Sequence, residues 1–243
     1  MTEMLFYRRP VALNRLQHAG VGVLPPIDFA FASEANAVIL VGMELSEAAR
    51  YYPIVFTRSV EGDCIPVAIV GLRRGENQFV ARDGSWDSAY CPAFVRRFPF
   101  VLAGSSDPER FFVCVDGDYL VDIGTPGSEP LFDAGGGESA YLRRATAFMQ
   151  QYNQQYQRTL EWTRQMLQRG MLTGMRAVLK QQSDDRSDID PGRFLVLDEE
   201  RLRALDAAAV EDWFRAGWLA WCHAHLISLG HFPGLAARLP QTS

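Results

Sequence analysis

The first 135 residues consist of short apolar runs separated by turn residues. Most runs have four to eight residues, are rich in Val, Ile and Phe, and are bounded by Gly, Pro, Asp or Asn. This pattern is typical of β-strands. It predicts a sheet-rich part whose strands include the runs 28–32, 37–41, 53–57, 65–72, 78–80 and 111–115.

Two segments inside this part are expected to be short helices. The first covers 46–52, where Ser46 is a favourable N-cap residue and Pro53 stops the helix. The second covers 87–97 and is closed by Pro99. The predicted sheet is therefore interrupted by helical insertions.

After residue 137 the spacing of apolar side chains changes to three and four residues. The stretch from Glu138 to Arg169 contains no Gly or Pro, and its apolar residues fall on one face of a helix. Its other face is rich in Gln and Arg. Gly170 follows directly and suits a C-terminal cap. One long amphipathic helix is therefore predicted.

The remaining residues predict a hairpin followed by further helices. Residues 171–197 have the pattern of a β-hairpin with an acidic loop at 183–192, which we expect to be mobile. Asp198 can cap a short helix over 199–204. Residues 207–229 predict one or two more helices with an apolar stripe that includes Trp218, Trp221 and Leu226.

These elements together predict an α+β fold, with a sheet-rich N-terminal part packed against a helical C-terminal part. The three glycines at 135–137 are the best candidate boundary. They would divide the chain into residues 1–135 and 138–243. The alternative is a single integrated domain in which these glycines form a loop.

Composition and charge exclude several function classes. The chain has 243 residues, of which 48% are hydrophobic and 22% charged, as in ordinary globular proteins. Its 29 acids and 24 bases give a net charge of −5, so nucleic-acid binding is not expected. The longest apolar runs are shorter than the roughly 18 residues that span a bilayer. No transmembrane segment and no signal peptide are predicted, and we expect a cytoplasmic location, with or without association with the cell envelope.

The cysteines and histidines form no dense ligand motif. The four cysteines lack a Cys-x-x-Cys pair and are expected to be free thiols. His223 and His225 would point about 200° apart on a helix and cannot easily share a metal. A site made of His18, His225 and Asp28 is the alternative, because two histidines and a carboxylate can hold a first-row metal. We expect no metal and no cofactor.

The most distinctive block of the sequence is 84–100, where two arginines stand among rigid aromatic residues. Arginine offers a planar fork for carboxylates, and aromatic rings add contact area at low entropic cost. This combination predicts a recognition patch for a protein partner or an acidic small ligand. The oligomeric state is left open. The residues expected to bind are Arg96, Arg97, Trp86, Tyr90, Asp28 and His18.

The alternative is that the aromatics are core and the arginines pair with Asp87 or Glu76. Adjacent helical side chains diverge by about 100°. We therefore expect one of Arg96 and Arg97 to be paired internally and the other to face the ligand.

Several motifs occur in an order that is found in a known family. They are PVALN at 10–14, DFAFA at 28–32, AARYYPIVF at 48–56, PVAIVGLR at 66–73, GENQFV at 75–80, AFVRRFPF at 93–100 and GWLAWCHAHLISL at 217–229. In this order the chain resembles the SapC family of bacterial proteins, named for a surface-layer-associated member. Cys91 and Cys222 depart from the aliphatic residues expected at their positions.

The resemblance implies a noncatalytic binding or scaffold role, linked to nutrient uptake at the envelope or to the surface layer. Genes of this family tend to lie beside those of TonB-dependent receptors, cupin-like proteins and halogenase-like proteins. The alternative function is a metal-dependent oxygenase-like or auxiliary enzyme that works with these neighbours. The family supplies no catalytic residues to transfer, so catalytic residues stay unassigned.

Overall fold

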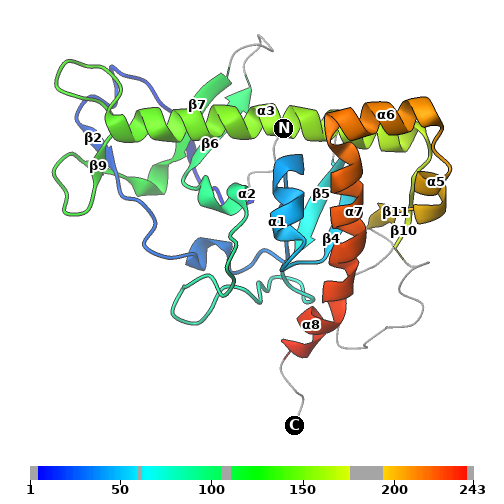
Figure 1. The fold of residues 1–243 in the computed structure, drawn as a ribbon. Helices are drawn as coiled ribbons and strands as arrows, with labels where there is room; N and C mark the ends of the chain where they lie inside the picture. Colours follow the sequence, from blue (N-terminus) through cyan, green and yellow to red (C-terminus); the bar gives the residue numbers. More distant parts are fainter. Residues whose placement is uncertain (1–4, 60–61, 105–110, 176–193, 240–243) are drawn as a thin grey trace. The chain divides into compact units, whose positions relative to one another are not determined.

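The structure is a computed structural model that describes residues 5–59, 62–104, 111–175 and 194–239. The chain divides into two units, each made of two separate stretches. The first unit comprises residues 1–29 and 95–154, and the second comprises 30–94 and 155–243. The long helix α3, Ala140–Gln168, is continuous across residue 154 and supplies one half to each unit (Figure 1).

The first unit holds two three-stranded antiparallel sheets. Their strands are β1 (Pro10–Ala12), β2 (Val21–Val23), β6 (Phe100–Gly104), β7 (Phe111–Asp116), β8 (Leu120–Asp122) and β9 (Glu129–Pro130). β7 lies between β1 and β6, and β2 lies between β8 and β9. The turn η3, Gly117–Tyr119, joins the two sheets along the chain.

The core of the first unit forms between these sheets and the first half of α3. Alternate residues of β6 and β7 point to the same face, which places Phe100 and Val115 in the core. Leu142 and Met149 are seven residues apart on α3 and therefore share one face of the helix. Val23, Leu131 and Phe132 complete the cluster.

The second unit is built on one five-stranded antiparallel sheet. Its strands are β3 (Ala37–Ile39), β4 (Ile54–Arg58), β5 (Cys64–Ile69), β10 (Leu172–Gly174) and β11 (Leu195–Leu197). They run in the order β10-β11-β4-β5-β3. All six residues of β5 are buried, as expected for a strand in the interior of a sheet.

Two helices of the second unit, α5 and α6, begin at aspartate caps. Asp198 and Asp206 each accept a hydrogen bond from a backbone N–H of the first turn. Gly217 ends α6 and begins α7 with a φ of +79°, a conformation that favours glycine. The elements are η2 (Gly42–Glu44), α1 (Leu45–Ala48), α5 (Glu199–Arg203), α6 (Ala207–Ala216), α7 (Trp218–Ser228), η5 (Leu229–His231) and α8 (Phe232–Ala237).

Aromatic side chains fill the core of the second unit. Trp162 of α3 is fully buried, with its ring centroid 5.5 Å from Phe56 of β4 and 5.4 Å from Trp221 of α7. The backbone of Gly42 lies against the Trp221 ring, because a Cβ added there would fall 2.4 Å from it. The sheet, α3 and α7 are thus joined through three rings.

The predicted α+β class is confirmed, with strands concentrated in the N-terminal part and helices in the C-terminal part. The long helix, its glycine cap and the hairpin strands β10 and β11 occur as expected. The acidic loop at 183–192 lies outside the described residues. The division into units differs from the expected one, since Gly135, Gly136 and Gly137 lie inside the first unit.

Several predicted elements are wrong or shorter than expected. The helix expected at 46–52 is only α1 (Leu45–Ala48), and Glu44 rather than Ser46 stands at its N-cap position. The run 28–32 ends in a 3-10 turn, η1 (Ala30–Ala32), closed by a bond from Ser33 N to Ala30 O. The run 78–80 forms only an isolated β-bridge between Val80 and Trp86, and Asn77 Oδ1 accepts the Phe79 N–H in a turn at its start. The helix expected at 87–97 is only α2 (Ala93–Arg96), since Pro92 disfavours helical backbone before it.

Candidate functional site

The residues predicted to bind a ligand do not all belong to one unit. Trp86 and Tyr90 lie in the second unit, whereas Arg96, Arg97, His18 and Asp28 lie in the first. Each group is therefore considered within its own unit.

Trp86 and Tyr90 are half-buried and hydrogen-bonded inward. Trp86 Nε1 donates to Tyr52 Oη at 2.9 Å and to the Tyr90 carbonyl at 3.0 Å. Tyr90 Oη donates to the buried carboxylate of Glu44 at 2.5 Å, and Tyr52 Oη also donates to the Tyr90 carbonyl. Burial raises the pKa of Tyr52 to about 12, so it remains a donor at neutral pH. The cluster stabilises the loop in which it lies.

The two adjacent arginines differ in burial. Arg97 is only 4% exposed, and its guanidinium carbon lies 5.9 Å from the Tyr7 ring centroid and 5.1 Å from that of Tyr152. Arg96 is exposed and lies 5.5 Å from the Phe148 ring centroid. Arg96 is therefore the one of the pair whose side chain is accessible.

The carboxylate expected to pair with an arginine of this block has a different partner. Asp87 Oδ2 accepts a hydrogen bond of 2.8 Å from Arg238, whose guanidinium also lies 4.3 Å from the Phe79 ring centroid.

His18 and Asp28 occupy loops of the first unit. His18 is 7% exposed, and its Nδ1 lies 3.0 Å from Asn14 N and 2.9 Å from Asn14 O, within its own loop. Asp28 is half-buried just before η1. His225, the third residue of the alternative metal site, lies in the other unit. Among the described residues, no three His, Cys, Asp or Glu side chains lie close enough together to hold a metal ion.

His225 is a neutral core residue. It is fully buried, its ring lies 4.8 Å from that of Phe56, and its Nε2 accepts the backbone N–H of Leu197 at 3.1 Å. Burial lowers the pKa of His225 to about 3. His223, two residues earlier on α7, is exposed, as expected for opposite faces of a helix.

Lowering the pH from 7 to 5 should therefore destabilise the protein through His225. The pKa is about 3 in the folded chain and about 6.5 in the unfolded chain, so only the unfolded chain takes up this proton in that range. The expected contribution is a loss of about 2 kcal/mol in the free energy of unfolding. His225→Gln keeps a hydrogen-bond acceptor without titrating. Urea unfolding at both pH values should show a smaller loss for the variant, and equal losses would contradict this assignment.

Two of the four thiols, Cys64 and Cys222, are poor nucleophiles. Cys64, Cys114 and Cys222 are buried, and Cys91 is half-buried. Burial raises the pKa of both Cys64 and Cys222 to about 12, which keeps these two thiols protonated at neutral pH.

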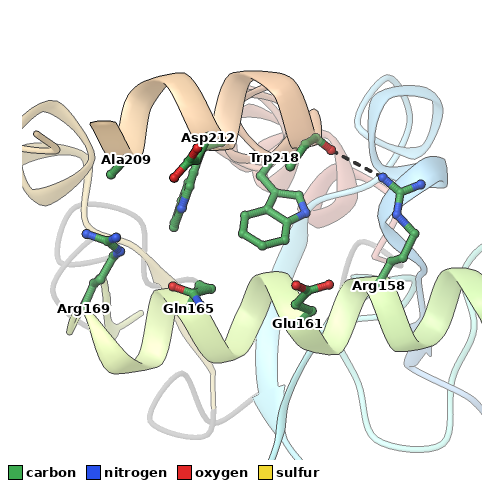
Figure 2. Close-up of a pocket in the computed structure, with 9 residues that line it drawn as sticks. Arg158, Glu161, Gln165, Arg169, Ala209, Asp212 and Trp218 are labelled. Atoms are coloured by element: carbon green, nitrogen blue, oxygen red, sulfur yellow. Dashed lines mark hydrogen bonds between the residues drawn. The ribbon is translucent and has the colours of Figure 1, made fainter. Parts of the chain in front are cut away.

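A groove of the second unit brings charged and aromatic side chains together. It lies between the second half of α3 and the α6–α7 pair and has a volume of about 390 Å³ (Figure 2). The helix α6 runs antiparallel to α3, because Asp206 at its start lies 4.0 Å from Arg169 and Ala216 at its end accepts a bond from Arg158. We call this site the tryptophan groove.

One wall of the tryptophan groove is a polar stripe of α3. Arg158, Glu161, Gln165 and Arg169 are spaced by three, four and four residues, which places them on one face of the helix (Figure 2). Eleven residues separate the two arginines, so they are about 16.5 Å apart along the helix axis. The two cations thus stand at the ends of the groove.

The opposite wall comes from α6 and the start of α7. Ala209, Asp212, Trp213 and Ala216 are spaced by three, one and three residues and share one face of α6. Trp218 adds a second indole (Figure 2). The two indole rings meet edge to face with centroids 5.7 Å apart.

Each arginine of the groove rests on an indole. Arg169 lies 6.0 Å from the Trp213 ring centroid, and Arg158 lies 5.6 Å from that of Trp221. Stacking on an aromatic face orients the planar guanidinium and leaves its N–H groups at the edge. Together with the contacts to Asp206 and to the Ala216 carbonyl, this stacking holds the two guanidinium groups at the ends of the groove.

The carboxylates of Glu161 and Asp212 lie between the two cations and are exposed. Within the part of the chain that the structure describes, neither makes a hydrogen bond or an ion pair. Along the groove the charges thus follow the order positive, negative, negative, positive. This arrangement can hold a ligand with the opposite order, but it contains no paired nucleophile and base.

Sequence analysis assigned no function to this groove, although half of the pattern was visible. The Gln- and Arg-rich face of the predicted long helix contains all four α3 residues. This face of α3 becomes the wall of a groove only because α6 lies opposite, and sequence spacing does not indicate that arrangement. Trp218, one of the two indoles of this groove, was expected only as part of the apolar stripe of the C-terminal helices.

Comparison with known proteins identifies a family but no characterised relative. The sequence profile described as SapC matches residues 13–235, which is nearly the whole chain. No curated protein and no solved structure matches the chain.

Proposed function

The chain belongs to the SapC family, and we propose that it is a noncatalytic binding or scaffold protein whose tryptophan groove holds a segment of a protein partner. The observation that supports this function is the charge order of the groove. A span of about 16.5 Å between the two arginines exceeds most small ligands but matches a short peptide. The partner segment would carry charges in the order negative, positive, positive, negative.

A second copy of this chain fits the groove poorly. In a two-fold symmetric dimer centred on the groove, the charges of one copy would face the charges of the other copy in reversed order. Because the order is the same in both directions, like charges would face each other. Like-charge contacts weaken association, so the proposal favours a different protein.

The link to the cell envelope is part of the same proposal. The family resemblance suggests a partner in nutrient uptake or in surface-layer function, and the protein is proposed to act from the cytoplasmic side. No helix among the described residues is long and apolar enough to cross a membrane.

Two peptides of identical composition test the groove. In an extended chain with a rise of about 3.3 Å, five residue steps span the two arginines. The acetylated and amidated peptide Glu-Ser-Lys-Lys-Ser-Glu should therefore bind more tightly than its isomer Lys-Ser-Glu-Glu-Ser-Lys. Fluorescence anisotropy at low salt measures both, and the preference should shrink as salt screens the charges.

Variants separate the groove from general surface charge. Glu161→Gln/Asp212→Asn should abolish the preference between the peptides. Glu200→Gln/Glu211→Gln removes two exposed carboxylates outside the groove and should preserve it. Equal binding of the two isomers to the unmodified protein would contradict the proposal.

A further inference from the structure

A second groove lies in the first unit, over the face of the β1-β7-β6 sheet and beside the first half of α3. It has a volume of about 720 Å³. Its sheet wall is apolar and includes Leu102, Phe111 and Val113. Phe111 is 43% exposed, so a phenyl ring is available to a ligand in the described part of this unit. We call this site the sheet groove.

The helix wall of the sheet groove is polar but uncharged. Thr146, Gln150, Asn153 and Gln154 are spaced by four, three and one residues and lie along one side of α3. A hydroxyl and three amides provide donors as well as acceptors. The three amides make no hydrogen bond to any other described residue. Thr146 Oγ1 is buried and has no hydrogen-bond partner among the described residues.

Formal charges at the sheet groove cancel. Arg15 and Glu138 are its charged lining residues, one of each sign. The Arg15 side chain lies beside the backbone of Gly136, 3.7 Å from where a Cβ would be. A single cation opposed by a carboxylate is a poor site for a phosphate or for an acidic polymer.

The two walls also disfavour an acyl chain and an extended peptide. An acyl chain would bury the amides of α3 without hydrogen-bond partners, which is costly. A peptide that adds as a strand binds along the edge of a sheet, whereas the lining residues Leu102 and Val113 pair across β6 and β7 and lie on the face of the sheet. A suitable ligand has an apolar face and many uncharged hydroxyl groups.

We propose that the sheet groove binds a neutral saccharide. The C–H face of a sugar ring packs on Phe111 and the aliphatic wall, while its hydroxyl groups donate to and accept from Gln150, Asn153 and Gln154. Thr146 Oγ1 gains a partner at the base of the groove. This site is separate from the tryptophan groove and does not depend on its function.

Titration calorimetry of the full chain with cellotetraose, maltotetraose, xylotetraose and mannotetraose tests the proposal. At least one of them should bind at millimolar concentration or below. Gln150→Ala/Asn153→Ala should weaken that binding about tenfold or more, since two hydrogen bonds are lost. Gln151→Ala removes an exposed amide of the same helix that does not line the groove, and should leave the affinity unchanged.

These substitutions replace Gln and Asn on a helix by alanine, the strongest helix former, so the variants should remain folded. Unfolding curves check this directly. The proposal is overturned if no tetrasaccharide binds the folded protein, or if the double variant binds as tightly as the unmodified chain. Binding of dodecanoate that the double variant leaves intact, without saccharide binding, would assign the groove to lipids instead.

Discussion

Replacing Trp221 by alanine should lower the free energy of unfolding by about 3–5 kcal/mol. Trp221 is 8% exposed and packs on the fully buried Trp162. It also fills the space above Gly42, where no Cβ would fit. The surrounding sheet and helices cannot close over the volume of an indole, so the variant would contain a cavity. Urea unfolding monitored by circular dichroism measures the loss.

Phe214→Ala is the matched control for this prediction. It removes a large aromatic side chain from the neighbouring helix α6, but Phe214 is 75% exposed. Its expected effect on the free energy of unfolding is within about 0.5 kcal/mol. If Trp221→Ala were equally mild, the position of α7 in the core would be incorrect.

Arg97→Gln should cost about 3 kcal/mol in the free energy of unfolding, whereas Arg96→Gln should change it by less than about 1 kcal/mol. Arg97 is enclosed by Tyr7 and Tyr152, and glutamine supplies neither a cation nor a planar fork of donors for them. Burial raises the pKa of Tyr7 to about 12, so its phenol stays neutral at physiological pH. Chemical unfolding of the two variants at the same pH gives the comparison.

Comparable losses in the free energy of unfolding for Arg97→Gln and Arg96→Gln would contradict the difference in burial. The exposed Arg96 stays a predicted partner contact. A partner that binds at this surface should lose affinity with Arg96→Gln at constant stability.

The parts of the fold that follow from local sequence were predictable. The helix at 138–170 was indicated by its uninterrupted apolar periodicity and by Gly170. The short helix after Asp198 was indicated by its cap. These features are decided by residues within one or two helical turns of each other, so a single sequence contains the information.

The strands β1, β2, β8 and β9, each of two or three residues, were not predicted. β1 pairs with β7 across about a hundred residues, and its backbone is extended because of that pairing rather than by its own composition. The same holds for β2, β8 and β9. Conversely, 28–32 has strand-like composition but ends in a local 3-10 turn, and 78–80 has strand-like composition but forms only an isolated β-bridge between Val80 and Trp86.

In the candidate site, too, features set by local sequence were predictable and features set by distant contacts were not. The stripe from Arg158 to Arg169 is a local feature of one helix, and by itself it resembles any solvated face. Asp212 and the indoles join the stripe only because α6 packs beside α3. The groove between the two helices then has the charge order that could select a partner segment. The aromatic block at 84–100 was prominent in the sequence, yet Trp86 and Tyr90 are hydrogen-bonded inward.

The charge order of the tryptophan groove is expected to select the partner. The most direct measurement compares two peptides on the unmodified protein and on Glu161→Lys/Asp212→Lys, a variant whose groove is positive throughout. Anisotropy should rank Glu-Ser-Lys-Lys-Ser-Glu above Glu-Ser-Glu-Glu-Ser-Glu for the unmodified protein and should reverse that ranking for the variant. The same ranking for both proteins would contradict the claim.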